Sequence, residues 1–196
     1  MTVTRPERIG FVQFAIVYVP FGLLVTLALV APERTQNPDL NRTVLTIWVT
    51  TLLLIPSLCL FMFRGVSGTA NNYWLLFWTF SFLSYLVHFY YGTFVQFDGF
   101  GDTLAKQGTL IAGTNFLLTF WWGIDVVLAW MFRSPPRWIW KQRVALNVFI
   151  FVVFIVADVF LKEGTIRSLG VMFAAVVGLC FLIRLYIASE KNAQVQ

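Results

Sequence analysis

The sequence predicts an all-α membrane protein with one transmembrane domain, a six-helix bundle spanning residues 1–196. Hydrophobic residues make up 59% of the 196 positions and charged residues 12%, whereas soluble domains carry about 25% charged residues. The apolar residues form long blocks, and about 20 apolar residues suffice for a helix to cross the hydrocarbon core of a bilayer. The blocks lack the two-residue alternation of barrel strands. Helices are therefore expected, because they satisfy their backbone polar groups internally in lipid.

Six apolar blocks follow one another along the chain. The first comes after a short polar lead, and its charged start with an apolar continuation imitates a signal peptide. The residues at its end make a poor cleavage site, so we interpret it as a retained helix. The third block is dense in aromatic residues, and a long glycine- and phenylalanine-containing loop follows it. The expected spans are 11–30, 43–63, 73–91, 110–132, 144–161 and 169–187.

The loop after the fourth span combines basic and indole side chains. Both kinds anchor membrane proteins at the headgroup layer, and the basic ones also attract anionic lipid. We expect these residues to be interfacial anchors. They are Arg133, Arg137, Trp138, Trp140, Lys141 and Arg143.

The distribution of Lys and Arg predicts that both termini face the cytoplasm. With the N-terminus inside, nine of the 14 basic residues lie on the inner side, and five lie outside. Basic residues prefer cytoplasmic loops, so this orientation is favoured. The inner residues are Arg5, Arg8, Arg64, Arg133, Arg137, Lys141, Arg143, Arg184 and Lys191, and the outer ones are Arg34, Arg42, Lys106, Lys162 and Arg167.

An inner polar layer is expected from Asp125, Asn147 and Arg184. A helix rises about 1.5 Å per residue, which places all three roughly 6–9 Å inward of the centres of their spans. A carboxylate at the bilayer centre costs about 3 kcal/mol on insertion scales, so Asp125 needs a partner. Arg184 is one candidate, acting as a clip between the fourth and sixth spans. Alternatively, Arg184 extends to the headgroups and Asp125 accepts a hydrogen bond from a neighbouring indole, Trp121 or Trp122.

An outer polar layer is expected from His88, Asn115 and Asp158, which lie roughly 8–9 Å outward of centre. A histidine beside a carboxylate could relay protons or bind a polar ligand group. The simpler alternative is that each of these residues hydrogen-bonds separately to water or to lipid headgroups. Ligation of a pigment or metal by His88 alone is a third.

The composition excludes several chemistries. A single histidine cannot support a bis-histidine haem or a histidine-rich di-iron site, and no lysine lies inside a span to form a retinal Schiff base. Cys59 and Cys180 show no metal-binding spacing and read as small apolar residues. We expect no metal site, no catalytic constellation and no nucleic-acid partner, since hardly any basic surface lies outside the membrane.

Three functions remain compatible with these patterns. The favoured one is a non-enzymatic integral membrane subunit or accessory protein that contacts lipids and packs against other membrane subunits, with a lipid, quinone or pigment as a possible bound ligand on its aromatic surfaces. The first alternative is a small transporter or proton pathway through Asp125, Arg184, His88 and Asp158. The second is a membrane enzyme acting on a lipid-like substrate, with His88 and Asp158 as its polar groups.

Overall fold

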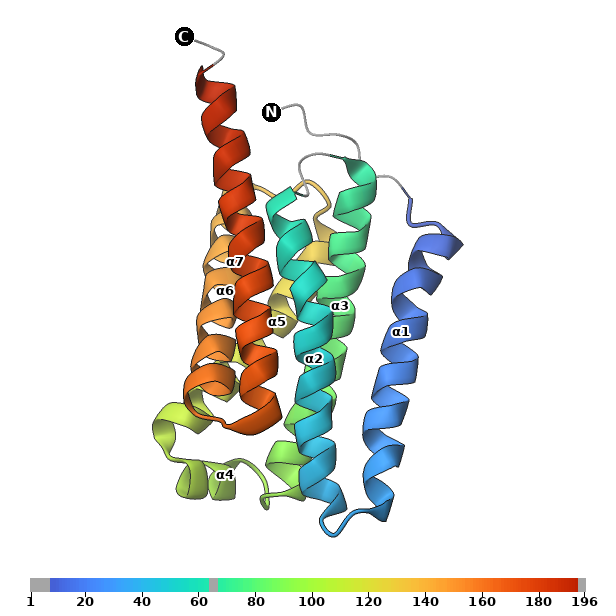
Figure 1. The fold of residues 1–196 in the computed structure, drawn as a ribbon, viewed down its shortest axis with the longest axis vertical. Coiled ribbons are helices and arrows are strands. Elements are labelled where there is room, and N and C mark those ends of the chain that lie inside the picture. The colour runs from blue at the N-terminus through green and yellow to red at the C-terminus, as the bar shows by residue number, and fades with distance from the viewer. Residues whose placement is uncertain (1–7, 64–66, 194–196) are drawn as a thin grey trace.

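The computed structural model describes residues 8–63 and 67–193, and this part of the chain forms a helical bundle without strands (Figure 1). Two π-helical turns continue α3 and α6, namely η2 (Tyr91–Val95) and η3 (Val156–Phe160), and a short 3₁₀ turn, η1 (Ala31–Arg34), follows α1. The α-helices are α1 (Phe11–Val30), α2 (Pro38–Phe63), α3 (Gly68–Tyr90), α4 (Phe100–Gln107), α5 (Thr109–Met131), α6 (Arg137–Ile155) and α7 (Gly164–Ala193).

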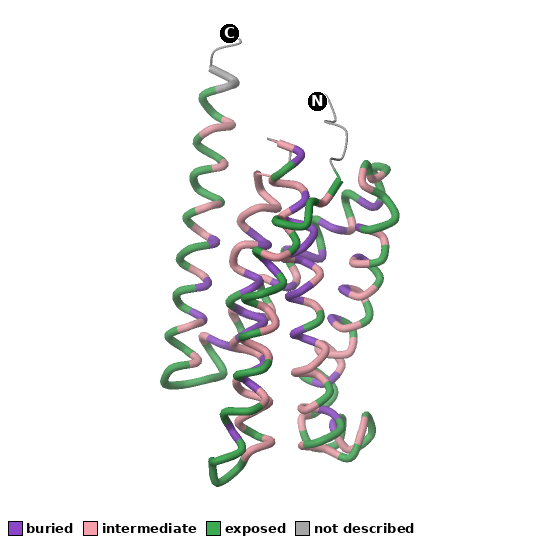
Figure 2. Tube along the Cα trace, turned by 90° about the vertical axis from the view of Figure 1, so that its right-hand side faces the viewer, coloured by how far each residue is buried: buried purple, intermediate pink, exposed green. Residues whose placement is uncertain are grey.

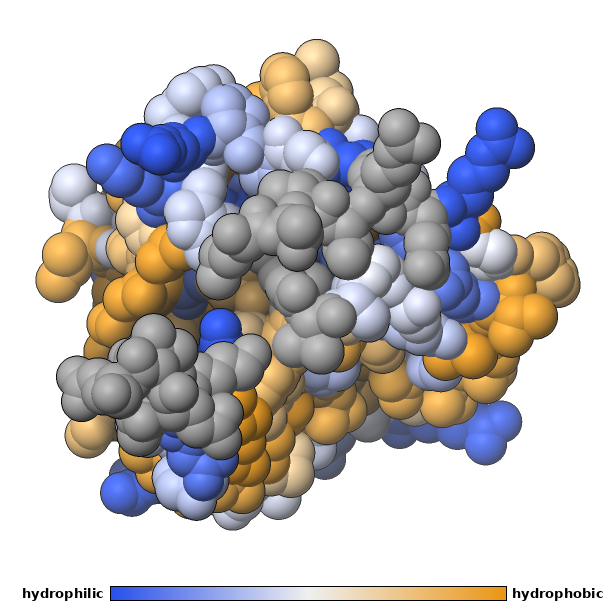
Figure 3. Space-filling model, turned by 90° about the horizontal axis from the view of Figure 1, so that it is seen from above, coloured by the Kyte–Doolittle hydropathy of each residue, from blue (hydrophilic) through white to orange (hydrophobic). Residues whose placement is uncertain are grey.

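Long helices run alternately up and down the bundle, and the short α4 lies at one end of it (Figure 1). α3 packs against α1, α2 and α5, and α7 packs mainly against α2. The start of α1, the turn between α5 and α6, and the end of α7 lie at the opposite end from α4 (Figure 1). Seen from that end, hydrophilic residues show on parts of the top and hydrophobic residues line the flanks (Figure 3).

Within residues 8–63 and 67–193, five segments are long and apolar enough to cross a membrane, which is the composition of an integral membrane protein. They are Phe11–Arg34, Pro38–Phe63, Thr109–Met131, Arg137–Phe160 and Gly164–Glu190. α3 is not among them, since its many Trp, Tyr, Ser and Asn side chains lower its mean hydropathy. It is nevertheless rich in buried residues. The count of six spans therefore stays a prediction.

Several helices extend beyond the predicted apolar blocks. α2 begins at Pro38 instead of residue 43, and α6 begins at Arg137 instead of residue 144. α7 starts five residues before the predicted boundary and ends six residues after it. Hydropathy locates the hydrocarbon-facing part of a helix, whereas its polar ends are set by backbone hydrogen bonding and by prolines. Pro38 occupies the first turn of α2 and Pro136 precedes α6, where a missing N–H costs little.

Most of the large buried side chains are apolar or aromatic. Trp78 and Trp122 are fully buried and lie 5.0 Å apart between ring centroids, with Leu54, Leu118 and Ile150 in the same core cluster. Buried residues concentrate in the middle helices, whereas α7 is exposed along most of its length (Figure 2). In the most apolar 18-residue stretch of each helix, 44% of the residues are buried in α2 and 11% in each of α1 and α7. α1 and α7 are thus the peripheral helices.

Small hydroxyl side chains join α2 to α3. Thr50 donates to the Thr46 carbonyl oxygen at 2.9 Å, and Ser84 Oγ lies 3.2 Å from Thr50 Oγ1 and 3.4 Å from the same carbonyl oxygen. All three residues are fully buried. Small polar residues permit close approach of helices in membranes and add hydrogen bonds between them, which explains why α2 and α3 form the most extensive helix pair.

Some predictions concern residues outside the part described. Arg5 and Arg64, counted in the orientation argument, lie outside it, as does the side chain of Lys191. The two cysteines are free, as expected.

Gly170 marks the closest approach of α7 to η3. A Cβ atom there would lie 2.8 Å from Asp158 Cβ and 3.0 Å from the Asp158 carbonyl carbon. We expect Gly170→Ala to force these segments apart and to lower the free energy of unfolding by about 1–3 kcal/mol, as overpacking does. Thermal unfolding in detergent measures the loss. Gly178→Ala is the matched control on the same helix, because a Cβ there meets nothing within 4 Å. Equal effects of the two substitutions would contradict the packing described.

Candidate functional site

The polar centre of the bundle is an ion pair between Asp125 on α5 and Arg143 on α6. Arg143 Nε lies 3.0 Å from both carboxylate oxygens of Asp125. The exposed fractions are 0% for Asp125 and 1% for Arg143. A buried ion pair requires further hydrogen bonds to offset its desolvation, and the neighbouring helices supply them.

Two neutral donors complete the coordination of the Asp125 carboxylate. Trp78 on α3 donates its indole N–H to Oδ2 at 3.0 Å, and the amide of Gln142 donates to Oδ1. Gln142 is oriented in turn by Trp121, whose indole N–H donates to Oε1 at 2.8 Å. The Arg143 guanidinium lies 4.9 Å from the ring centroid of Trp74, within cation–π distance. The cluster therefore connects α3, α5 and α6.

The early start of α6 brings Arg143 into the core. Because α6 begins at Arg137, Arg143 lies nearly two turns inside the helix. It shares its face with the buried residues Ile139, Leu146 and Ile150, at spacings of three and four residues. The prediction that Arg143 is an interfacial anchor is wrong. The sequence pattern places Arg143 in the loop after the fourth span, whereas the residue lies inside α6 and is buried.

Arg184 is not the partner of Asp125. It is half-buried on α7 and forms no ion pair among the residues described. Arg143 takes its place, and Trp78 takes the place expected of Trp121 or Trp122 as the indole donor. Asn147, one turn after Arg143 on α6, donates its amide N–H to the Arg143 backbone carbonyl oxygen at 2.8 Å. The spacing of Arg143 with the apolar residues of α6 was the signal that could have identified it.

The outer-layer residues do not hydrogen-bond to one another in the part of the chain described. His88 Nδ1 lies 2.8 Å from the Thr43 carbonyl oxygen, so Nδ1 carries a hydrogen and donates it. The Asn115 carbonyl oxygen accepts from Tyr85 Oη at 3.3 Å, and the Tyr85 and His88 rings lie 6.0 Å apart. Asp158 lies in η3 beside α2, with Thr51 Oγ1 at 3.5 Å.

The remaining predicted anchors lie at the α5–α6 end. Arg137, Trp138, Trp140 and Lys141 are exposed. Arg133 is half-buried and donates to Asn72 Oδ1 at 3.3 Å. Their contact with headgroups stays a prediction.

At the α4 end, Asp102 forms an ion pair with Lys106 at 2.8 Å. The hydrogen bond from Lys106, aided by one from the Asp98 backbone N–H, holds the pKa of the Asp102 carboxyl below its usual value.

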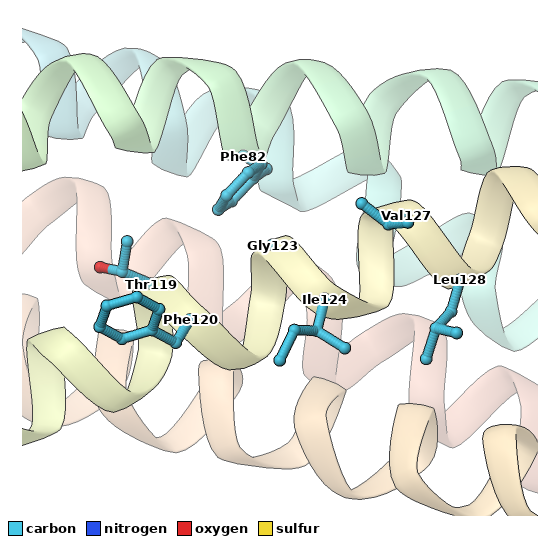
Figure 4. A pocket seen from close by; sticks show the side chains of 7 residues that line it. All are labelled: Phe82, Thr119, Phe120, Gly123, Ile124, Val127 and Leu128. Carbon is cyan, nitrogen blue, oxygen red and sulfur yellow. The ribbon is translucent and has the colours of Figure 1, made fainter.

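An open apolar groove follows the outward face of α5, where it passes α3 (Figure 4). Its volume is about 440 Å³, and Phe82 of α3 reaches towards Gly123 at its floor. A Cβ at Gly123 would lie 3.0 Å from the Phe82 ring, so the missing side chain makes this approach possible. The other lining residues are Thr119, Phe120, Ile124, Val127 and Leu128.

Comparison of the chain with protein-family models, with curated proteins and with solved structures gave no match. The fold and site define the class directly: a helical bundle with several apolar spanning segments and a paired charge cluster at its centre. Among the residues described, no group of three or more His, Cys, Asp or Glu could hold a metal ion.

We expect Asp125→Leu to leave the Arg143 charge buried without a partner, and to lower the free energy of unfolding by about 3–5 kcal/mol. The double variant Asp125→Leu/Arg143→Met removes both charges and should recover most of this loss. Chemical unfolding in detergent micelles, analysed as a double-mutant cycle, measures the coupling.

Arg137→Gln is the control for this cycle, because Arg137 is exposed on the same helix. It should change stability by no more than about 0.5 kcal/mol. Additive losses from Asp125→Leu and Arg143→Met would show that the pair is not coupled.

Proposed function

We propose that the protein is a multi-pass integral membrane subunit that acts by packing, through α7, against the transmembrane helix of another membrane protein. One observation carries the proposal. Asp125 and Arg143 pair with each other and Trp78 donates to the same carboxylate, while α1, α5 and α7 present apolar side chains outward. A protein with this distribution interacts through its membrane-embedded surface, because large exposed apolar surfaces mark lipid or protein contacts.

α7 is the helix best suited to a partner. One edge, with Gly170, Phe173 and Val177, is buried against the bundle. The opposite face remains open, and Leu179 and Leu182 are 58% and 61% exposed. Half-buried Gly178 would accommodate close approach of another helix, since a Cβ there meets nothing within 4 Å. The end of α7 also stands beyond the other helices (Figure 1).

Arg184 favours a different protein over a second copy as the partner. It lies in the spanning segment Gly164–Glu190 and forms no ion pair among the residues described. A carboxylate on a partner helix at the same depth would offset the cost of this charge. Arg184 follows Val177 by seven residues, so it lies on the bundle-facing side of α7 and not on the open face. A second copy would not supply the carboxylate, since Asp125 is paired with Arg143 and Asp158 is buried within its own bundle.

The proposed topology has six crossings, with α3 as the sixth and both termini cytoplasmic. α3 has low hydropathy, yet its polar and aromatic side chains are largely covered by α1, α2 and α5, so little of them would meet lipid. The start of α1 and the end of α7 share one end of the bundle with the basic turn between α5 and α6 (Figure 1). The positive-inside rule then favours a cytoplasmic location for that end.

The groove on α5 is the proposed place for a bound lipid-like molecule. Its lining is apolar apart from the Thr119 hydroxyl, and Phe120 and Phe82 flank it with aromatic rings. An acyl or isoprenoid chain, such as that of a lipid or quinone, has the matching chemistry, because it replaces one apolar contact with another and requires no hydrogen bond.

Native mass spectrometry of the complex extracted from its own membrane tests the partner. We expect a heteromeric species that is lost in Ala175→Trp, which places a bulky ring on the open face of α7. Arg184→Gln should reduce the fraction in complex at least several-fold.

Leu23→Trp, on the exposed surface of α1, is the control and should leave the complex intact. Unchanged complex in both α7 variants would overturn the proposed surface. A species whose mass is a whole multiple of 22.5 kDa would identify a second copy as the partner and contradict the proposal.

A further inference from the structure

The second buried carboxylate, Asp158, lies in a very different setting from Asp125. It belongs to η3 and is 4% exposed. It is enclosed by Thr51 of α2 on one side and by Gly170 of α7 on another. The residue therefore lies where three segments meet, namely α2, η3 and α7.

The hydrogen positions around Asp158 determine whether its carboxyl group donates or accepts a hydrogen bond. Its contact is with Thr51 Oγ1, at 3.5 Å from Oδ2. Thr51 Oγ1 is also 2.9 Å from the Ile47 carbonyl oxygen, which can only accept. A hydroxyl has a single hydrogen, and the shorter contact takes it. Thr51 consequently turns a lone pair towards Asp158, and a lone pair matches a carboxyl group that itself carries a hydrogen.

The elements packed around Asp158 bring no opposite charge into contact with it. α2 has no charged residue from Thr43 to Phe63, α6 and η3 have none from Val144 to Ala157, and α7 has none from Ser168 to Ile183. Lys162, beyond the end of η3, is exposed and forms no ion pair with Asp158 in the described part of the chain. Arg167, one turn before Gly170, and Glu163 are also exposed.

We propose that Asp158 is a proton-binding site, and that the proton on its carboxyl is what allows α2, η3 and α7 to pack together. In this state the Asp158 O–H donates to Thr51 Oγ1, and a neutral group occupies the apolar junction. On release, the O–H bond breaks and the proton passes to water at the exposed turn after η3, leaving a carboxylate. An ionised group cannot stay in this setting without water or a cation, so proton release would loosen the contact at Gly170. The proposal is independent of whether α7 binds a partner.

Infrared spectroscopy detects this proton directly. A protonated carboxylic acid has a carbonyl stretch separate from the amide and carboxylate bands. We expect the detergent-solubilised wild type at neutral pH to show this band, and Asp158→Asn to lose it. The amide side chain has nearly the shape of the protonated carboxyl and can donate to Thr51 Oγ1, so this variant should fold. Glu163→Gln, which changes an exposed carboxylate five residues away, is the control and should retain the band.

A second measurement uses unaltered protein in its membrane. A hydrophobic carbodiimide adds to a protonated carboxyl within the apolar phase, and peptide mass spectrometry locates the adduct. We expect labelling of Asp158. The proposal is overturned if the wild type shows no protonated carboxyl band, if folded Asp158→Asn retains it, or if adducts form at exposed carboxylates while Asp158 stays unmodified.

Discussion

The requirement that a buried charge be compensated organises this bundle. Asp125 and Arg143 neutralise each other at the centre, and their geometry obliges α3, α5 and α6 to keep one register, because Trp78 and Gln142 reach the same carboxylate. The indoles around the pair supply both apolar bulk and N–H donors. Compensation is not complete: the buried atoms without a hydrogen-bond partner in the part described include Arg143 Nη2, Asn147 Oδ1 and the indole nitrogen of Trp122.

The surroundings of this centre follow a different principle. α2 and α3 associate through small hydroxyl residues, whereas α1 and α7 are attached along narrow edges and leave most of their apolar surface outward. In lipid the hydrophobic effect does not drive apolar helix surfaces together, so association of helices depends on close packing and hydrogen bonds. The bundle accordingly has a tightly specified interior and a periphery available to lipid or to another protein, and this difference underlies the function we propose.

Composition and block length were sufficient to predict a helical protein with membrane-spanning segments, because hydrocarbon restricts the possible backbone structures. Composition and block length did not suffice to predict which polar side chains contact one another. Arg143 was assigned to a loop because hydropathy does not detect a helix that starts in a polar segment. Arg184 was matched to Asp125 because the two residues lie at similar depths in their spans. Depth ignores direction around the helix axis, which decides that Arg143 faces the core. The Asp125–Trp78 bond was also missed, because its residues are 47 positions apart and carry no local pattern.

The π-helical turn that holds Asp158 has an evolutionary consequence. A π-helical turn contains one residue more than an α-helical turn. In η3, which continues α6, the Leu161 N–H closes the turn by donating to the Val156 carbonyl oxygen at 3.1 Å. A relative that had lost the additional residue would keep all of its long helices and still lack the widened turn. A one-position gap within 156–160 in an alignment would then separate homologues that possess the carboxyl-bearing turn from those that have a plain helix end.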